Sequence, residues 1–205
     1  MVQNLVRGGV AVETNDPKRY EQTQRDLEGR LRQQEARLQA LLDVTGLLSS
    51  NWDVSQLFPQ ISARLRRVLR QEFASFALHD PGTGLLVHQA VDFPLAKGPI
   101  STVQEGTKTS PAGCSMQERT PLIFTKEQLS AFDEEVAKGL LAEGMQSLCC
   151  VPLMRPKGPL GVFVLASTRQ DAFHDEDLQL LNQVAAQLAI AVENHRAAYE
   201  IDQLK

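Results

Sequence analysis

The feature that most constrains the fold is a pair of apolar segments that each turn back on themselves. The first begins at Phe73 and is divided by a stretch dense in turn-forming residues at 80–84. The second begins at Ser147 and is divided at 155–159. Two strands joined by a short turn form a hairpin, and hairpins build antiparallel sheets. Strands are predicted at residues 73–79, 85–91, 121–125, 147–154 and 160–167.

Helical patterns lie on both sides of these strands in the sequence. Residues 54–70 form an apolar stripe that Asn51 or Asp53 can cap, and a long helix is predicted from Asp175 to the C-terminus. A shorter helix at 133–143 ends at Gly144. Residues 92–120 show little periodicity, and long loops of this kind are usually functional. This order predicts an α+β fold, with helices on one face of an antiparallel sheet and the loop-rich middle on the other.

Residues 17–50 predict one long helix with a heptad seam, because they are rich in Glu, Gln, Arg and Leu. The seam positions are Tyr20, Gln24, Leu27, Leu31, Gln34, Leu38, Leu41, Thr45 and Leu48. Most are apolar, which is typical of a coiled coil whose polar positions set the register. Over residues 20–38 the seam predicts either an intermolecular coiled coil or a helix packed on its own domain. Beyond Leu41 the apolar stripe widens, as expected of a helix that joins a core.

Composition narrows the function classes. The net charge is −4, so no overall positive field favours nucleic acid. No apolar run approaches the length of a membrane span, and the first residues do not resemble a secretion signal. Three cysteines without such a signal predict free thiols in a reducing cytoplasm. There is also no phosphate-binding loop motif of the kind that ATPases use.

Cys149 and Cys150 are adjacent on a predicted strand, so their side chains point to opposite faces. This favours packing over a shared metal or a mutual disulfide. A redox or metal site between Cys114 and Cys149 stays open as an alternative, as does an iron site at His79 and His88. We predict no cofactor and no catalytic residue, because the carboxylates of 133–135 and 175–177 are explained by their places at helix starts.

Several segments resemble a GAF domain. Residues 144–153 and 158–165 are similar to its paired central strands, and residues 172–181 and 187–194 are similar to its closing helix. Residues 109–122 resemble the segment that covers the ligand pocket. Within the family, the chain is most similar to sensory GAF domains of sigma-54-dependent transcriptional activators of the formate-hydrogenlyase-activator type. Where relatives commonly carry a Trp-Val pair, this chain has Cys114 and Ser115.

The resemblance implies a six-stranded antiparallel sheet with a small-molecule pocket on the loop face and signalling helices on the other. It implies four regions: a flexible leader (1–16), a coiled-coil signalling helix (17–40), the GAF domain (41–196) and the start of a C-terminal linker helix (197–205). The residues expected to bind the ligand are Phe76, Val87, Ala112, Cys114, Met116, Leu140, Cys149 and Phe163. The dimer interface is expected at Tyr20, Leu27, Leu31, Leu38, Leu188 and His195.

The function expected from this resemblance is small-molecule sensing in a cytoplasmic regulator. A homodimer would transmit the ligand state through its helices to an output domain outside this sequence, with no direct contact of this piece with nucleic acid or membrane. Three alternatives stay open. These are a ligand-free dimerisation spacer, the sensor of a histidine kinase, and an enzyme related to the methionine-sulfoxide reductases that share the GAF fold.

Overall fold

The computed structural model describes residues 17–48, 53–95 and 104–203. The expected leader and the alternative cap Asn51 lie outside the described residues, as do residues 204–205 of the expected linker. The chain divides into two compact units between Ala36 and Arg37. None of the helices in the described segments combines the length and the apolar content that a membrane span requires.

The first unit is described from residue 17, as the first part of helix α1 (Pro17–Leu48). Every side chain described between Tyr20 and Ala36 is exposed. Ion pairs one helical turn apart join Glu21 to Arg25 and Glu28 to Arg32, at 3.5 and 3.8 Å. Such pairs add a few tenths of a kcal/mol each to a helix. They support the predicted helix, but its leucines at 27 and 31 contact no core.

The second unit contains a six-stranded sheet in the order β3-β2-β1-β6-β5-β4, and every neighbouring pair is antiparallel. The strands are β1 (Phe73–Asp80), β2 (Leu85–Asp92), β3 (Gln104–Gly106), β4 (Leu122–Thr125), β5 (Ser147–Arg155) and β6 (Gly158–Ser167). The predicted hairpins are confirmed as β1–β2 and β5–β6, and β1 and β6 pair at the centre. The α+β fold with an antiparallel sheet is therefore confirmed.

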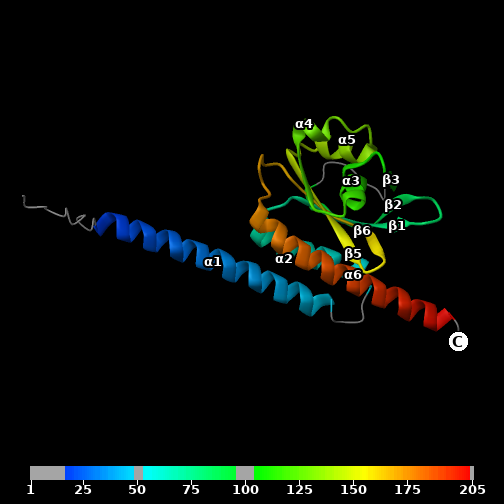
Figure 1. Ribbon diagram of the computed structural model, residues 1–205, viewed down its shortest axis with the longest axis horizontal. Helices are drawn as coiled ribbons and strands as arrows, with labels where there is room; N and C mark the ends of the chain where they lie inside the picture. Colours follow the sequence, from blue (N-terminus) through cyan, green and yellow to red (C-terminus); the bar gives the residue numbers. More distant parts are fainter. Residues whose placement is uncertain (1–16, 49–52, 96–103, 204–205) are drawn as a thin grey trace, which may run out of the picture. The chain divides into compact units, whose positions relative to one another are not determined.

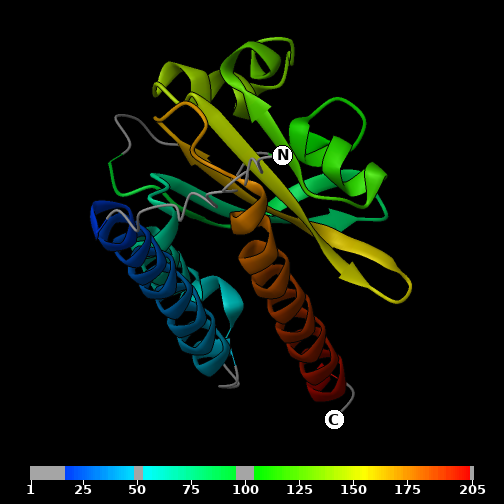
Figure 2. The same ribbon diagram turned by 60° about the vertical axis from the view of Figure 1, so that its left-hand side comes forward.

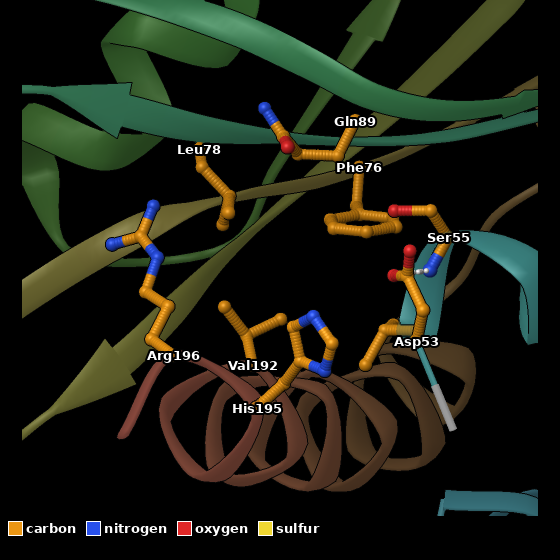
Figure 3. A pocket seen from close by; sticks show the side chains of 9 residues that line it. Asp53, Ser55, Phe76, Leu78, Gln89, Val192, His195 and Arg196 are labelled. Atoms are coloured by element: carbon orange, nitrogen blue, oxygen red, sulfur yellow. Dashed lines mark hydrogen bonds between the residues drawn. The ribbon is translucent and has the colours of Figure 1, made fainter. Parts of the chain in front are cut away.

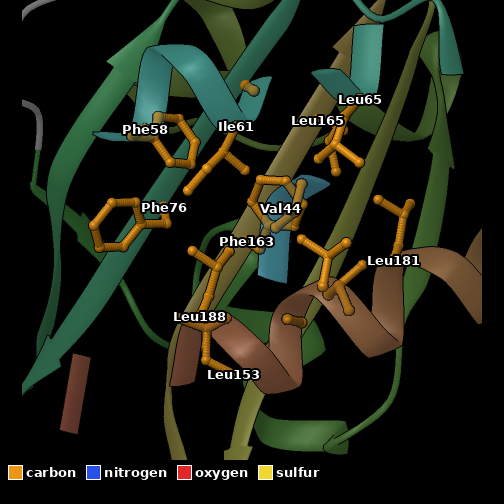
Figure 4. Packing of buried hydrophobic residues seen from close by; sticks show 14 of the residues in the cluster. Val44, Phe58, Ile61, Leu65, Phe76, Leu153, Phe163, Leu165, Leu181 and Leu188 are labelled. Carbon is orange, nitrogen blue, oxygen red and sulfur yellow. The ribbon is translucent and has the colours of Figure 1, made fainter. Parts of the chain in front are cut away.

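One face of the sheet, here called the helix face, packs against α2 (Val54–Leu69) and α6 (Asp175–Gln203) (Figures 1 and 2). Asp53 caps α2 by accepting a hydrogen bond from the Ser55 backbone N–H at 2.9 Å, as the sequence predicts. The core between these layers is built from the apolar stripe of α2, sheet residues such as Phe76 and Phe163, and α6 residues such as Leu188 (Figure 4). Val44 of α1 is buried in the same core.

A partly buried ion pair links helices α1 and α6. Arg37 of α1 donates hydrogen bonds to Glu176 at 2.9 Å and to Asp177 at 2.6 Å, both at the start of α6. Burial works to lower the pKa of Arg37, but its bonds to the two carboxylates outweigh this effect and raise the pKa. Arg37 therefore remains charged and holds the start of α6 against α1.

The opposite face, here called the loop face, carries three short helices: α3 (Pro111–Glu118), α4 (Lys126–Leu129) and α5 (Glu135–Ala142) (Figure 2). A second apolar core lies beneath them. Helix α4 and strand β3 were not predicted, because each is too short to show a period, and α3 was not predicted because its small residues form no clear apolar stripe. Helix α5 was predicted, and it ends before Gly144, whose φ of +87° suits glycine.

Candidate functional site

A buried histidine–glutamate pair lies on the loop face at one edge of the sheet. His88 of β2 and Glu105 of β3 approach to 2.7 Å between Nε2 and Oε1. Their side chains are only 3% and 2% exposed. The register explains the contact, because Glu105 pairs with Leu86, which lies on the same face two residues from His88. The tautomer of His88 sets which of the two atoms donates this bond.

Two buried polar atoms on this face have no hydrogen-bond partner within the described segments: Nδ1 of His88 and Oγ of Ser75. Ser75 lies in β1 between Val91 and Val164, both of which contact the loop-face core. His88 is paired with Ala77, two residues further along β1. Buried polar groups are almost always satisfied by protein, water or ligand. The described part of the loop face thus holds one hydroxyl and one ring nitrogen without a hydrogen-bond partner.

Helix α3 covers the neighbouring part of the loop face. Ser110 caps the helix by accepting from the Gly113 N–H at 3.0 Å. Ser115 donates to the backbone carbonyl of Cys150 in β5, at 3.0 Å. A side chain at position 113 would place its Cβ 2.4 Å from the Thr107 carbonyl oxygen, so only glycine permits this close approach. These contacts fix α3 over strands β5 and β6, in the segment expected to cover a pocket.

The eight predicted ligand residues are divided between the two faces. Ala112, Met116 and Leu140 lie in the loop-face core, and Cys114 is half-buried on α3. Phe76, Cys149 and Phe163 instead lie in the helix-face core, and half-buried Val87 pairs with Leu78 of that core. Placing all eight around one cavity is therefore wrong. Period-two alternation predicts which residues share a face, but a shift of one residue exchanges the faces.

Cys149 and Cys150 point to opposite faces, as predicted: Cys149 packs with α6 and Cys150 lies in the loop-face core. Burial raises the pKa of Cys149 to about 12 and that of Cys150 well above its ordinary value. Burial, aided by Glu118, also raises the pKa of Cys114. All three thiols are free and disfavour the reactive thiolate form. Among the described residues, no group of three metal-ligating side chains comes together.

The predicted interface residues also separate into two groups. Tyr20, Leu27, Leu31 and Leu38 are between 56% and 61% exposed, and His195 is exposed on α6. Leu188 is a correction, because it is fully buried in the helix-face core and offers no surface to a second chain. Ile190, two residues later in α6, is a large apolar residue that is exposed.

Sequence reasoning missed the polar residues of the loop face. The sequence suggests only an alternative iron site for His88, whereas its side chain is buried against Glu105. The available signal was its spacing of two from Leu86, which places both side chains on one face. Glu105 and Ser75 carried no comparable signal, because their burial depends on strand pairing between distant segments.

Comparison with known sequences agrees with this architecture. A sequence profile of the GAF domain family matches residues 53–193. The formate hydrogenlyase transcriptional activator of Salmonella typhimurium strain SL1344 is 26% identical over 169 residues, which cover 80% of this chain. The match covers 24% of that protein, so this chain spans about a quarter of its length.

Solved structures of low sequence identity share the fold. The GAF domain of a phosphoenolpyruvate-protein phosphotransferase from Coxiella burnetii has a TM-score of 0.70 at 17% identity, covering 81% of this chain and 98% of that one. Free methionine-R-sulfoxide reductase from Neisseria meningitidis, solved with its substrate, has a TM-score of 0.65 at 18% identity. The match covers 79% of this chain and 91% of the reductase. The shared fold thus includes both an enzyme and a domain of a larger protein.

Proposed function

The chain belongs to the GAF domain family, and from this premise we propose that it is the small-molecule-sensing domain of a cytoplasmic signal-transduction or transcription regulator. The single observation that supports sensing is the pair of unpaired buried atoms, His88 Nδ1 and Ser75 Oγ, on one face of the sheet. A ligand that bonds to both would remove a desolvation cost of about 1–3 kcal/mol for each atom. The favoured ligand is a small polar molecule with both donor and acceptor groups.

Ligand binding on the loop face would be transmitted to the rest of the protein through the helices on the helix face. Strand β1 carries Ser75 on the loop face, and its next residue, Phe76, packs against Phe58 of α2 on the helix face, with ring centroids 5.1 Å apart. A shift of β1 would therefore move Phe76 and change its contact with Phe58 of α2. A ligand can change that arrangement only by its difference in affinity between two states.

The exposed seam of α1 supports transmission through a homodimer. Tyr20, Leu27, Leu31 and Leu38 expose large apolar side chains in the single chain. A second copy of the same helix would bury them in a coiled coil, with Gln24 and Gln34 fixing the register. The output domain would lie elsewhere in the full regulator, as the length of the transcriptional activator suggests.

A dimerisation spacer is the second candidate, favoured by the packing of the loop face. Leu86, Met116 and Leu140 are buried there and fill space that a ligand would need. A thiol-dependent reductase is disfavoured, because burial keeps Cys149 and Cys150 protonated. We therefore propose a sensor rather than an enzyme.

A thermal-shift screen separates sensor from spacer. Panels of small amides, nucleobases and carboxylates are added to the wild-type protein and to Ser75→Ala, His88→Gln and His174→Gln. In His88→Gln the new side-chain amide still donates towards Glu105 but Nδ1 is lost, and exposed His174 serves as the matched control. A sensor shows at least one compound that raises Tm in the wild type and in His174→Gln, and not in the other two.

Ser75→Ala gives a further distinction. Without ligand it should match or exceed the wild-type Tm, because it removes an unsatisfied buried hydroxyl. If no compound in any class raises Tm, the spacer is favoured. If a compound raises the Tm of Ser75→Ala and His88→Gln as it does that of the wild type, it binds outside the loop-face cluster of Ser75 and His88.

A further inference from the structure

A cavity lies on the helix face, on the other side of the sheet from Ser75 and His88. It has a volume of about 490 Å³, within the usual range for small-molecule sites. Four elements line it: the start of α2, strands β1 and β2, and the last described side chains of α6 (Figure 3). We call it the helix-face crevice; its lining residues are Asp53, Val54, Ser55, Phe76, Leu78, Gln89, Val192, His195 and Arg196.

Charges of opposite sign lie at its two ends. Figure 3 shows the Arg196 guanidinium on one side, and the carboxylate of Asp53 with the Ser55 hydroxyl on the other. Arg196 has no ion-pair partner among the described residues. Oδ1 of Asp53 accepts the Ser55 N–H at 2.9 Å, and Oδ2 has no partner within the described segments. A cation and an anion that face one cavity without meeting each other suit a ligand that carries both charges.

The space between these ends has an apolar floor, and the polar side chains of Gln89 and His195 border it (Figure 3). Phe76 and Leu78 project from β1, and Val192 faces them from α6 (Figure 3). Phe76 is 1% exposed and Leu78 is 6% exposed, so the floor of the crevice is part of the core and is already ordered. An apolar group resting on this floor would gain roughly 25 cal/mol for each Å² removed from water. The crevice thus combines an apolar floor with a guanidinium at one end and a carboxylate at the other.

We propose that the helix-face crevice binds a zwitterionic small molecule with an apolar substituent, of the apolar α-amino-acid class. Its carboxylate pairs with Arg196, its ammonium group pairs with Oδ2 of Asp53, and its substituent lies on Phe76 and Leu78. Such a ligand bridges the start of α2 and the distal part of α6. The site is separate from the loop-face cluster, and its occupancy does not require that cluster to bind anything.

Three probes of similar size test the charge requirement. L-Phenylalanine carries both charges, 3-phenylpropanoate only the carboxylate, and 2-phenylethylamine only the ammonium group. Binding is measured by calorimetry and by NMR shifts of the Gln89 side-chain amide. We expect L-phenylalanine to bind at least about tenfold more tightly than either single-charge probe, the ratio for one lost charge-assisted contact. Equal affinity for all three, or no binding of any, overturns the proposal.

Three variants locate the binding. Arg196→Gln should weaken L-phenylalanine about tenfold or more. Asp53→Asn keeps an N-cap, so α2 should remain folded, but it should abolish the preference for L-phenylalanine over 3-phenylpropanoate. Arg67→Gln removes the same charge from an exposed site on α2 outside the crevice, and it should bind as the wild type does. If Arg196→Gln also binds as the wild type does, the probe sits elsewhere and the assignment fails.

Discussion

At the scale of single residues, Cys149 and Cys150 occupy two different cores although they are adjacent in the chain. Each is sealed from solvent, whereas Cys114 is partly accessible on α3. At about pH 8 a thiol reagent should therefore modify one cysteine of the folded protein slowly, and all three after unfolding. Cys114→Ala should show no reactive thiol when folded. Rapid modification of two or three thiols in the native protein would contradict this burial and revive the reductase alternative.

The same burial predicts a loss of stability at alkaline pH. The folded pKa of Cys149 is about 12, against an ordinary value of 9.0, and that of Cys150 is also raised. Above about pH 9 the unfolded chain loses these protons and the folded chain keeps them, so stability present below pH 9 declines as pH rises towards 12. The free energy of unfolding should fall by about 1.4 kcal/mol per pH unit for each thiol. Urea unfolding of the wild type and of Cys149→Ala/Cys150→Ala between pH 8 and 10 measures this pH dependence. If the free energy of unfolding falls equally steeply with pH in both proteins, the buried thiols are not its cause.

The cysteines also show what the sequence could predict at this scale. Alternation along a strand was enough to place the two thiols on opposite faces. It could not say which face each one meets, because that depends on which side the helices pack. Of the predicted ligand residues, Phe76, Cys149 and Phe163 therefore lie in the helix-face core, where Phe76 lines the helix-face crevice, whereas Ala112 and Met116 lie in the loop-face core.

At the scale of elements, Arg37 in the interior of α1 is joined by ion pairs to the start of α6. Its side chain is 14% exposed and that of Asp177 is 10% exposed, so removing either partner leaves a shielded charge. We expect Arg37→Ala to lower the free energy of unfolding by about 2 kcal/mol, below the range for fully buried pairs because Glu176 is exposed. Arg32→Ala, which removes an exposed ion pair in α1, should change little.

A double-mutant cycle isolates the Arg37–Asp177 interaction. Urea unfolding of Arg37→Ala, Asp177→Asn and the double variant should give a coupling of about 1–2 kcal/mol. Additive effects would show that the two side chains contribute independently. Asp177 also accepts the His174 N–H at 2.9 Å, so Asp177→Asn alone perturbs the start of α6 as well.

The long helices were predictable, and of the two eight-residue helices only α5 was. Helices α1, α2 and α6 have enough turns to show a stripe, and the capping role of Asp53 could be read directly. Helix α3 has eight residues, and its signals are Ser110 followed by Pro111. Strand β3 has three residues and is defined by its pairing with β2, which no local pattern reveals.

At the scale of the whole molecule, the two units should differ in resistance to protease. Arg25, Arg30 and Arg32 are exposed in a helix without core contacts, and such helices open readily. Arg37 is held by its ion pair. Brief trypsin treatment should therefore release a stable fragment that begins at Gln33, identified by mass spectrometry.

The same digestion tests the proposed homodimer. A coiled coil through Leu27 and Leu31 would protect these arginines, so cleavage should slow as protein concentration rises. Leu27→Ser/Leu31→Ser removes two seam residues and should be cut rapidly at every concentration, with the fragment from Gln33 unchanged. A cleavage rate independent of concentration in the wild type would argue against dimerisation through this seam.

The sheet order has a consequence for synthesis on the ribosome. The two central strands, β1 and β6, come from the beginning and the end of the sheet's sequence, and Phe73 pairs with Ala166. A nascent chain that has emerged only through β5 must leave one edge of β1 without its neighbour, and unpaired edges recruit other strands. Completion of this domain therefore waits for nearly all of its residues, and stalled intermediates are the species that chaperones would need to shield.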